Sequence, residues 1–176
     1  MRRALRTLLV AICLAAPAVC LSQAGPAPSL KAEYLYRFLL YVTWPADRFL
    51  RLASPIVVGV VADDALASEL RRVTTDREPQ GRPVVVRSLR PTDSLSEVHA
   101  VFYGSSMNPM LAQLIASATG SVLIVTEAQG GLALGSVINL ILEDQRLLFE
   151  VNLEEAKKRR LGISASLLSA AVNVAK

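Results

Sequence analysis

Cysteine and histidine are scarce in this chain of 176 residues, and their scarcity argues against several kinds of chemistry. The two cysteines, Cys13 and Cys20, lie near the N-terminus, and His99 is the only histidine. Zinc sites are built mainly from cysteine and histidine ligands, so we expect no metal site. Nucleophilic catalysis needs a nucleophile, a base and an orienting group. A single histidine inside the apolar stretch 98–103 is a poor base, so we expect no enzyme and no cofactor.

The first 24 residues have the layout of a secretory signal peptide. Arg2, Arg3 and Arg6 precede a mostly aliphatic run over 8–21, and Ser22-Gln23-Ala24 supplies small residues before a cleavage site. The run is shorter than the ~20 apolar residues that span a bilayer. We therefore expect export to the periplasm with cleavage near Ala24. The alternative is an uncleaved membrane anchor.

Removal of this segment changes what the chain can do. It takes away three arginines and both cysteines, which lowers the formal net charge from +4 to +1 and rules out an internal disulfide. A charge this small does not indicate a nucleic-acid-binding protein. The remaining residues, 25–176, are predicted to form a single domain, because a chain of about 150 residues can bury about two-thirds of its unfolded surface.

Apolar periodicity predicts alternating helices and strands in the first two-thirds of the chain. A first helix is expected over 30–43, with Leu35, Phe38, Leu39 and Val42 on its buried face, and it should end at Trp44 because Pro45 follows. Strands are expected at 55–62, 84–89, 98–103 and 121–126, and further helices at 65–74 and 109–118.

The alternation of helices and strands ends in the last third of the chain. Strands at 137–142 and 147–153 are joined by a short turn and predict a hairpin. A helix over 153–160, capped by Asn152, should precede a final helix that begins at Ser164 and carries Leu168, Ala171, Val172 and Ala175 on one face. The predicted class is α/β, with a mostly parallel central sheet, helices on both faces and a C-terminal antiparallel hairpin.

Three polar residues are candidates for a small-molecule site. Asp63 and Asp64 follow the strand at 55–62, and ligands of parallel α/β sheets bind beyond the carboxyl ends of the strands. Asn139 lies on an otherwise apolar strand and could line the same pocket. The competing interpretation is that the two aspartates cap the next helix and that Asn139 pairs with backbone groups.

Other motifs have structural explanations. The turn 104–108 resembles a hydrolase nucleophile elbow, but Asn108 replaces the closing glycine, so a turn and helix cap are expected. The glycines within 130–135 match no nucleotide-binding spacing and predict a flexible loop or bulge. The basic run 157–160 is expected to be a solvated helix end, with an acidic partner or lipid surface as the alternative.

Aromatic residues are concentrated on the first helix. With Leu35, Phe38, Leu39 and Val42 buried, the remaining large side chains cannot all point inward. Tyrosine and arginine carry much of the energy in protein interfaces, so a partner-binding surface is predicted. Alternatively, two of the tyrosines close the rim of the core with their hydroxyls in water. The predicted contact residues are Tyr34, Tyr36, Arg37, Tyr41 and Trp44.

The chain resembles the YfiR-like family of small periplasmic proteins from about Lys31 to Val174. The opening motif carries most of the resemblance: Lys31, Ala32, Tyr34, Leu35, Phe38, Val42, Trp44 and Pro45. Further matches lie around Gly59 to Asp64, at 81–83, at 138–139, at 149–153 and at 161–168. Arg37 departs from the asparagine that is usual in the family.

The resemblance implies a regulatory protein. Family members resemble a periplasmic inhibitor that acts on the periplasmic portion of a membrane-bound diguanylate cyclase of the YfiN type and so limits cyclic-di-GMP signalling and biofilm formation. An outer-membrane lipoprotein is expected to sequester the inhibitor, and the inhibitor is expected to form a homodimer. The alternative hypothesis is a periplasmic small-molecule-binding sensor module.

Overall fold

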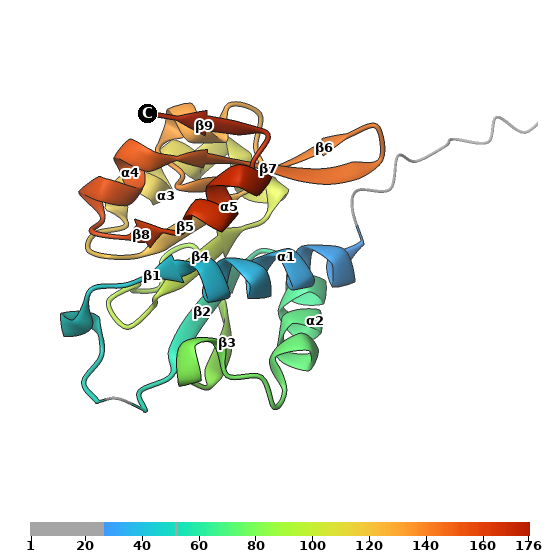
Figure 1. Ribbon diagram of the computed structural model, residues 1–176. Coiled ribbons are helices and arrows are strands. Elements are labelled where there is room, and N and C mark those ends of the chain that lie inside the picture. Colours follow the sequence, from blue (N-terminus) through green and yellow to red (C-terminus); the bar gives the residue numbers. More distant parts are fainter. Residues whose placement is uncertain (1–26, 52) are drawn as a thin grey trace, which may run out of the picture.

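The computed structural model describes residues 27–51 and 53–176. The predicted signal peptide and its two cysteines lie outside these residues. A seven-stranded sheet forms the centre, with helices on both faces and a hairpin whose tip projects beyond the carboxyl ends of the parallel strands (Figure 1). The predicted α/β class, with a mostly parallel sheet and a late antiparallel hairpin, is confirmed.

The strand order places a crossover near the middle of the sheet. Strands β3, β2, β4, β5 and β6 are parallel, β7 runs antiparallel to β6, and β9 runs parallel to β7. After β2 the chain forms β3 on one side of β2, and it then crosses back to form β4 on the other side of β2. The order across the sheet is β3 (Val84–Leu89), β2 (Ile56–Val61), β4 (Ala100–Tyr103), β5 (Leu123–Thr126), β6 (Ile138–Glu143), β7 (Arg146–Asn152) and β9 (Asn173–Ala175).

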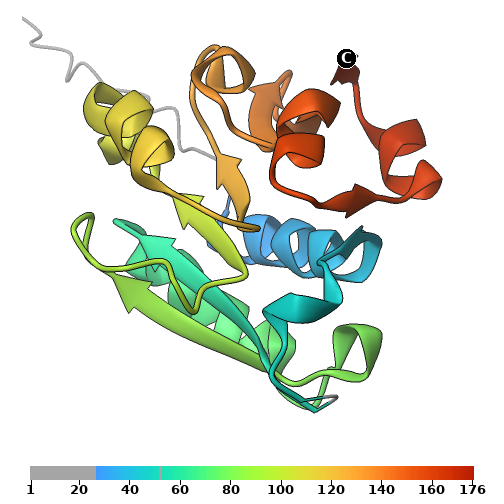
Figure 2. The ribbon, with the colours of Figure 1, turned by 90° about the vertical axis from the view of Figure 1, so that its left-hand side faces the viewer.

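Helices cover both faces of the sheet, which explains why every residue of β2 and β4 is buried. One face carries α1 (Pro28–Tyr41), α2 (Asp64–Thr74), α4 (Leu153–Lys158) and α5 (Ala165–Ala170). The other carries α3 (Leu111–Ser117), which Figure 2 shows on the side of the sheet away from α1. Short 3₁₀ turns are η1 (Ala46–Arg48), η2 (Pro79–Gly81), η3 (Ser105–Met110) and η4 (Gly131–Leu134).

Helix α1 ends earlier than the position of Pro45 suggested. Its last residue is Tyr41, and Val42 is already extended. Val42 and Thr43 form β1, which pairs antiparallel with β8 (Gly162–Ile163). β-branched residues favour extended backbone, and this pairing satisfies their backbone groups before Pro45 is reached. The predicted end of the helix, at 43, was therefore wrong by two residues.

The C-terminal prediction was also partly wrong. Helix α5 stops at Ala170, and Ala171 is extended. The Val172 N–H donates to the Phe149 carbonyl over 3.0 Å, and β9 then continues along β7. The apolar spacing at 168–175 therefore does not mark one helix face. Strand pairing prevails because β7 would otherwise present an unpaired edge.

An aromatic cluster closes the amino-terminal edge of the sheet. The Trp44 indole is 8% exposed, and its N–H donates to the His99 carbonyl over 2.8 Å. The Phe49 ring stacks on the His99 imidazole at 4.6 Å, and the Arg82 guanidinium lies 3.7 Å from the Phe49 centroid. The cluster ties the chain between α1 and β2 to the start of β4, and Trp44 covers the end of the core.

The His99 side chain is held in its neutral form. Its Nδ1 accepts from the Val57 N–H over 3.1 Å, and its Nε2 lies 3.3 Å from the Arg48 carbonyl, to which the Nε2–H tautomer donates. Burial lowers the pKa of His99 below its usual value of 6.5. The charges of Arg48 and Arg82 lower the pKa further, and the hydrogen bond to the Arg48 carbonyl opposes them. The structural role expected for this histidine accounts for all of these contacts.

Stability should therefore fall as the solution becomes acidic. The unfolded chain binds a proton at His99 more readily than the folded chain, so the stabilisation is complete above about pH 6.5 and declines as the pH drops towards the folded-state pKa. We expect the free energy of unfolding, measured by urea denaturation, to decrease between pH 7.5 and pH 5. The variant His99→Asn keeps an acceptor for the Val57 N–H and should show a flatter profile. Equal slopes for the two proteins would contradict this assignment.

Candidate functional site

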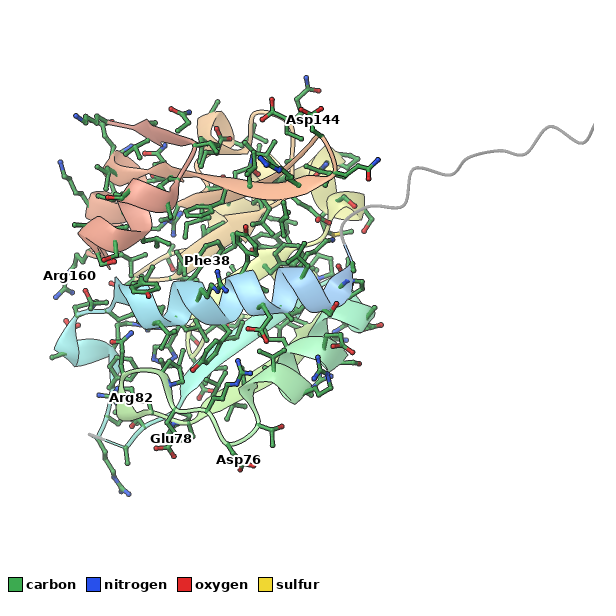
Figure 3. All side chains as sticks on the ribbon, turned by 45° about the vertical axis from the view of Figure 1, so that its right-hand side comes forward. Phe38, Asp76, Glu78, Arg82, Asp144 and Arg160 are labelled. Carbon is green, nitrogen blue, oxygen red and sulfur yellow. The ribbon has the colours of Figure 1, made fainter. Side chains whose placement is uncertain are left out.

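Helix α1 carries most of the predicted contact residues, and the fold separates them into two groups. The core-facing side of α1 includes Ala32, Leu35, Phe38 and Leu39, of which the last three were predicted from the periodicity. The fourth predicted residue, Val42, is buried but lies just past the end of the helix. Helix α2 lies along one flank of α1, and α5 touches the other (Figure 1). Figure 3 shows α1 crossing this face of the molecule between the hairpin tip and the segment around 76–82. Only the outward stripe of α1 is open to a partner.

Tyr34 lies against the core and contributes to its packing. Its hydroxyl donates to the Leu147 carbonyl over 2.7 Å. Its ring meets Phe38 and Phe149 edge-on, with centroids 6.2 and 6.1 Å away. Aromatic pairs in this geometry add about 0.5–1.5 kcal/mol beyond the burial of their surface. The structure therefore gives Tyr34 an intramolecular role, which joins α1 to β7.

Tyr36 is half-buried and is covered by an arginine. The Arg77 guanidinium lies 5.0 Å from the Tyr36 centroid, and the same arginine approaches the Glu33 carboxylate at 3.4 Å. Trp44 is buried against His99, as described above. The Trp44 N–H is hydrogen-bonded and the Tyr36 ring is covered by Arg77, which leaves little of either side chain for a partner.

Two of the predicted contact residues are exposed and unengaged. Arg37 and Tyr41 point to solvent, and neither side chain makes a hydrogen bond or ion pair within the described part of the chain. Leu30 and Leu40 flank them and are 42% and 38% exposed. These four residues fall within about 100° of the helix circumference at 3.6 residues per turn. We call Leu30, Arg37, Leu40 and Tyr41 the α1 surface.

A buried ion pair anchors the first turn of α1 at the carboxyl edge of the sheet. Lys31 is 7% exposed, and its Nζ lies 3.4 Å from Asp63 Oδ2 and forms a shorter ion pair with Glu127 Oε2. Glu127 Oε1 accepts from the Ser105 N–H over 3.0 Å. These residues follow β2, β4 and β5, so Lys31 fills the crevice where the strand order reverses. Ligands of doubly wound folds commonly occupy that position.

Both predicted aspartates lie at the start of α2. Asp63 Oδ1 accepts from the Leu66 N–H over 2.9 Å, so this residue caps the helix and binds Lys31 at the same time. Asp64 is exposed in the first turn, where a negative charge suits the helix dipole. The capping interpretation explains the contact of Asp63 with the Leu66 N–H but not its ion pair with Lys31. In the described residues no three His, Cys, Asp or Glu side chains cluster in a way that could hold a metal ion.

Asn139 lies apart from the aspartates, in its own polar network on β6. Its Oδ1 accepts from Thr126 Oγ1 over 2.7 Å and from the Ala128 N–H over 3.0 Å. Its amide nitrogen donates to the Ala128 carbonyl and to Glu150 Oε1, over 2.9 and 3.0 Å. All four hydrogen-bonding positions of the side chain are therefore used. Gly131 packs so closely that a Cβ there would lie 2.4 Å from Asn139 Oδ1.

A cavity of about 330 Å³ lies beside this network, at the base of the β6–β7 hairpin. Its lining includes Asn139 but neither Asp63 nor Asp64, so the fold does not bring the three predicted ligand residues into one pocket. The acidic side chains of Glu127 and Glu150 lie at the cavity, and its apolar part is formed by Ala128, Leu140, Ile141 and Leu142.

The hydrolase alternative fails on geometry. Ser106 lies in η3, after the carboxyl end of β4, and His99 lies just before the amino end of the same strand. Four strand residues between them span about 13 Å. The serine and the only histidine therefore cannot form a nucleophile–base pair.

The basic run 157–160 is more engaged than a solvated helix end. Arg159 donates to the Ala118 carbonyl over 2.8 Å, at the carboxyl end of α3, and burial lowers its pKa. Arg160 pairs with Asp47 at 2.9 Å, and Lys158 lies 3.7 Å from Glu155. Arg159 thus contacts the end of α3, whereas Glu155 of the same helix pairs with Lys158. A cation suits the carboxyl end of a helix, which explains this preference.

The sequence interpretation missed the burial of Lys31, although a signal for it exists. Lys31 precedes Leu35 by one turn and shares the face of Phe38 and Val42, so its position is a core position. A lysine at such a position requires a buried partner. The sequence does not show which carboxylates provide it, because Asp63 and Glu127 are 32 and 96 residues away.

Removal of the Lys31 charge should destabilise the fold. In the variant Lys31→Met, Asp63 and Glu127 would face each other across a largely dry crevice, and breaking a buried pair in this way costs about 3–5 kcal/mol. We expect a loss of that order in the free energy of unfolding, measured with urea. As a control, Arg72→Met removes an exposed arginine that pairs with Glu69 on the same face of the sheet, and it should cost under about 1 kcal/mol. Equal losses in the two variants would contradict the anchor.

Comparison with known proteins agrees with this architecture. A family profile described as YfiR/HmsC-like matches residues 28–172, which run from the start of α1 to the residue before β9. A search of curated proteins gives no match to the chain. The matched stretch covers most of the sequence and includes the Lys31 anchor, the Trp44–His99 cluster and the Asn139 network. The chain belongs to the YfiR/HmsC-like family.

Proposed function

We propose that the protein is a periplasmic regulator that binds the periplasmic portion of a membrane-bound diguanylate cyclase and inhibits it. Inhibition lowers cyclic-di-GMP and with it biofilm formation. Membership of the YfiR/HmsC-like family supports a regulatory role in the periplasm. Export through a signal peptide cleaved near Ala24 is part of the proposal. Among residues 27–51 and 53–176, no helix is both long and apolar enough to span a membrane.

The α1 surface is the observation that carries this proposal. It combines an unpaired arginine and an exposed tyrosine with two exposed leucines on a single helix stripe. Arginine and tyrosine are enriched among the residues that dominate binding energy, and apolar neighbours exclude water around them. The opposite face of α1 is fixed to the core, so the stripe is presented without a large ordering cost on binding.

The proposed contact set is narrower than the one the sequence suggested. Arg37 and Tyr41 remain as direct contacts. Tyr34 and Trp44 form hydrogen bonds within the protein and pack against its core, and the Tyr36 ring is covered by Arg77. An outer-membrane lipoprotein that binds the same stripe would compete with the cyclase and relieve inhibition.

Substitutions on the α1 surface should release the cyclase while leaving the fold intact. We expect Arg37→Glu and Tyr41→Ala each to weaken binding by about 1.4 kcal/mol or more, which is about tenfold or greater in affinity. Cellular cyclic-di-GMP, measured by mass spectrometry in a strain that carries the variant in place of the natural gene, should rise towards the level of a deletion strain.

The control is Arg146→Glu, which makes the same charge change at the exposed tip of the β6–β7 hairpin. This variant should keep cyclic-di-GMP at the level of the unaltered strain. The proposal fails if deletion of the gene leaves the nucleotide level unchanged. The assignment of the α1 surface fails if Arg37→Glu and Arg146→Glu behave alike while both proteins accumulate normally.

The second candidate function is a small-molecule sensor, and the cavity at the hairpin base favours it. The acidic Glu127 and Glu150 lie beside apolar side chains, which suits a ligand with one amino group and an apolar body. Glu127 also binds Lys31, so a ligand there would act on the anchor of α1.

A thermal-shift screen of free amino acids and their amines tests this candidate. We expect at least one of these compounds to raise the melting temperature. The rise should shrink in Leu142→Ser, which alters the cavity wall, and persist in Leu30→Ser, which removes an exposed leucine elsewhere. The absence of any stabilising compound in the panel would count against the sensor.

A further inference from the structure

Strand β3 forms one outer edge of the sheet and is open along six residues. Among the strands of residues 27–51 and 53–176 it pairs only with β2, in a parallel register that sets Ile56 opposite Val84. The opposite edge is formed by β9, which has three residues. Long unpaired edges template strand addition unless they are covered. In the described part of the chain, β3 is therefore the edge best suited to accept another strand.

The register shows which backbone groups of β3 are free. The Ile56 N–H donates to the Pro83 carbonyl, and successive residues of a parallel strand alternate between facing the neighbour and facing away. The backbone groups of three residues therefore point outward, namely Val84, Val86 and Ser88. Of these groups, the Val86 carbonyl has one long contact, to Arg71 Nε at 3.4 Å.

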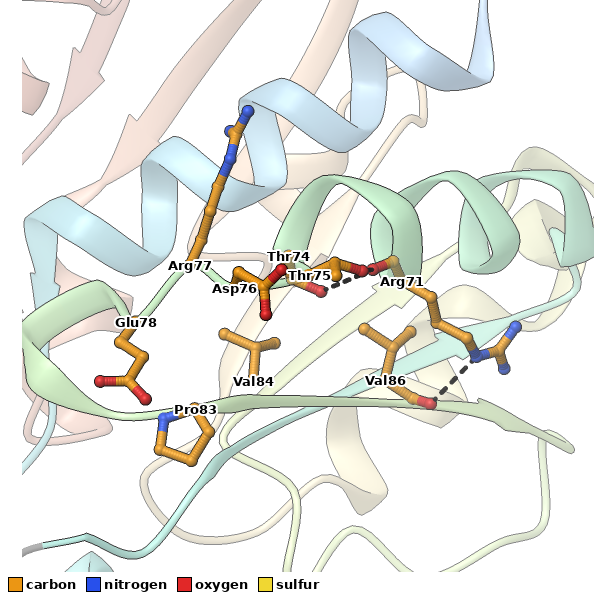
Figure 4. Close-up of a pocket in the computed structure, with 9 residues that line it drawn as sticks. All are labelled: Arg71, Thr74, Thr75, Asp76, Arg77, Glu78, Pro83, Val84 and Val86. Atoms are coloured by element: carbon orange, nitrogen blue, oxygen red, sulfur yellow. Dashed lines mark hydrogen bonds between the residues drawn. The ribbon is translucent and has the colours of Figure 1, made fainter.

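A groove of about 310 Å³ runs beside this edge, between β3 and the carboxyl end of α2 (Figure 4). Val84 and Val86 are half-buried and form its apolar side. Figure 4 shows Arg71 at the end near Val86, and Asp76 and Glu78 towards the end at Pro83. Arg71, Asp76 and Glu78 all lack a salt bridge within the described residues. Arg77 also lines the end at Pro83, but its charge is paired with Glu33 at 3.4 Å, so the unpaired charges make the groove positive at one end and negative at the other.

We propose that this edge receives β3 of a second copy of the chain, in antiparallel orientation about a two-fold axis at Val86. The two outward Val86 residues would then face each other, and Val84 would face Ser88 of the partner subunit. Each facing pair exchanges two backbone hydrogen bonds in such a ladder. The half-buried valines of both copies would close the two grooves into one apolar layer.

Charge polarity favours a second copy over an unrelated peptide. An antiparallel pair brings the positive end of each groove to the negative end of the other. Arg71 would give up its 3.4 Å contact with the Val86 carbonyl and its 3.0 Å hydrogen bond to Ser88 Oγ, and would approach Glu78 of the partner subunit. The two-fold axis would form the same contact twice. A two-fold interface must be self-complementary in this way. The family resemblance implies a homodimer but does not indicate which surface forms the interface. The groove beside β3 provides that surface in this proposal.

The backbone ladder is tested by proline at an outward position. Val86→Pro removes an N–H that faces away from β2, so it spares the internal ladder. Val86→Thr keeps the N–H and the branched shape. We expect sedimentation equilibrium to show a dimer for the unaltered mature chain and for Val86→Thr, and at least about a tenfold higher dissociation constant for Val86→Pro. A monomeric unaltered chain, or equal dissociation constants for the two variants, would overturn the proposal.

The charge contact is tested by a reciprocal swap, which also serves if the proline variant does not fold. Arg71→Glu and Glu78→Arg each place like charges across the interface, so each variant alone should be monomeric. An equimolar mixture of the two restores opposite charges at both ends and should dimerise.

Arg72→Glu makes the same charge change one residue away, where the arginine pairs with Glu69, and it should leave the dimer intact. A mixture that stays monomeric while Arg72→Glu dimerises would exclude the proposed contact. Dimerisation of both single swaps would place the interface elsewhere.

Discussion

The ion pair that Lys31 forms with Asp63 and Glu127 is the contact on which the arrangement of α1 depends. It fixes the first turn of the helix to the carboxyl ends of two strands, in the crevice where the sheet order reverses. A buried ammonium group cannot leave this position without exposing two carboxylates to each other in a dry site. The ion pair thus holds the first turn of α1 against the sheet without any contribution from the outward-facing residues.

The rest of α1 is held by contacts of other kinds. Tyr34 joins the middle of the helix to β7, and the β1–β8 pair and the Trp44–His99 bond hold the chain where the helix ends. Two contacts within the 14 residues of α1 and two just past its end leave a single stripe in solvent. In the proposed dimer the two-fold axis is normal to the sheet, which keeps both copies of this stripe on the same face. Two linked sites bind a paired partner more tightly than one.

Much of the fold could be predicted from the sequence because its signals are local. The apolar run over 55–62 and the caps at Asp63 and Asn152 placed their elements correctly. The last helix was overextended because the spacing of Val172 fits a helix as well as an edge strand. Only the free edge of β7 decides between them. The end of α1 was missed for the same reason, because β8 lies 120 residues away from β1.

The candidate site shows the same division between sequence and tertiary structure. The sequence by itself determined that the first helix carries aromatic and basic residues beyond those its core face can bury. Only the tertiary structure decided that Tyr34 and Trp44 turn inward and that Arg37 and Tyr41 stay free. The physical reason is that helical periodicity gives the direction of a side chain, whereas its burial depends on which distant segment packs there. The carboxylates around Lys31 and the open edge of β3 follow from strand order, which no local pattern encodes.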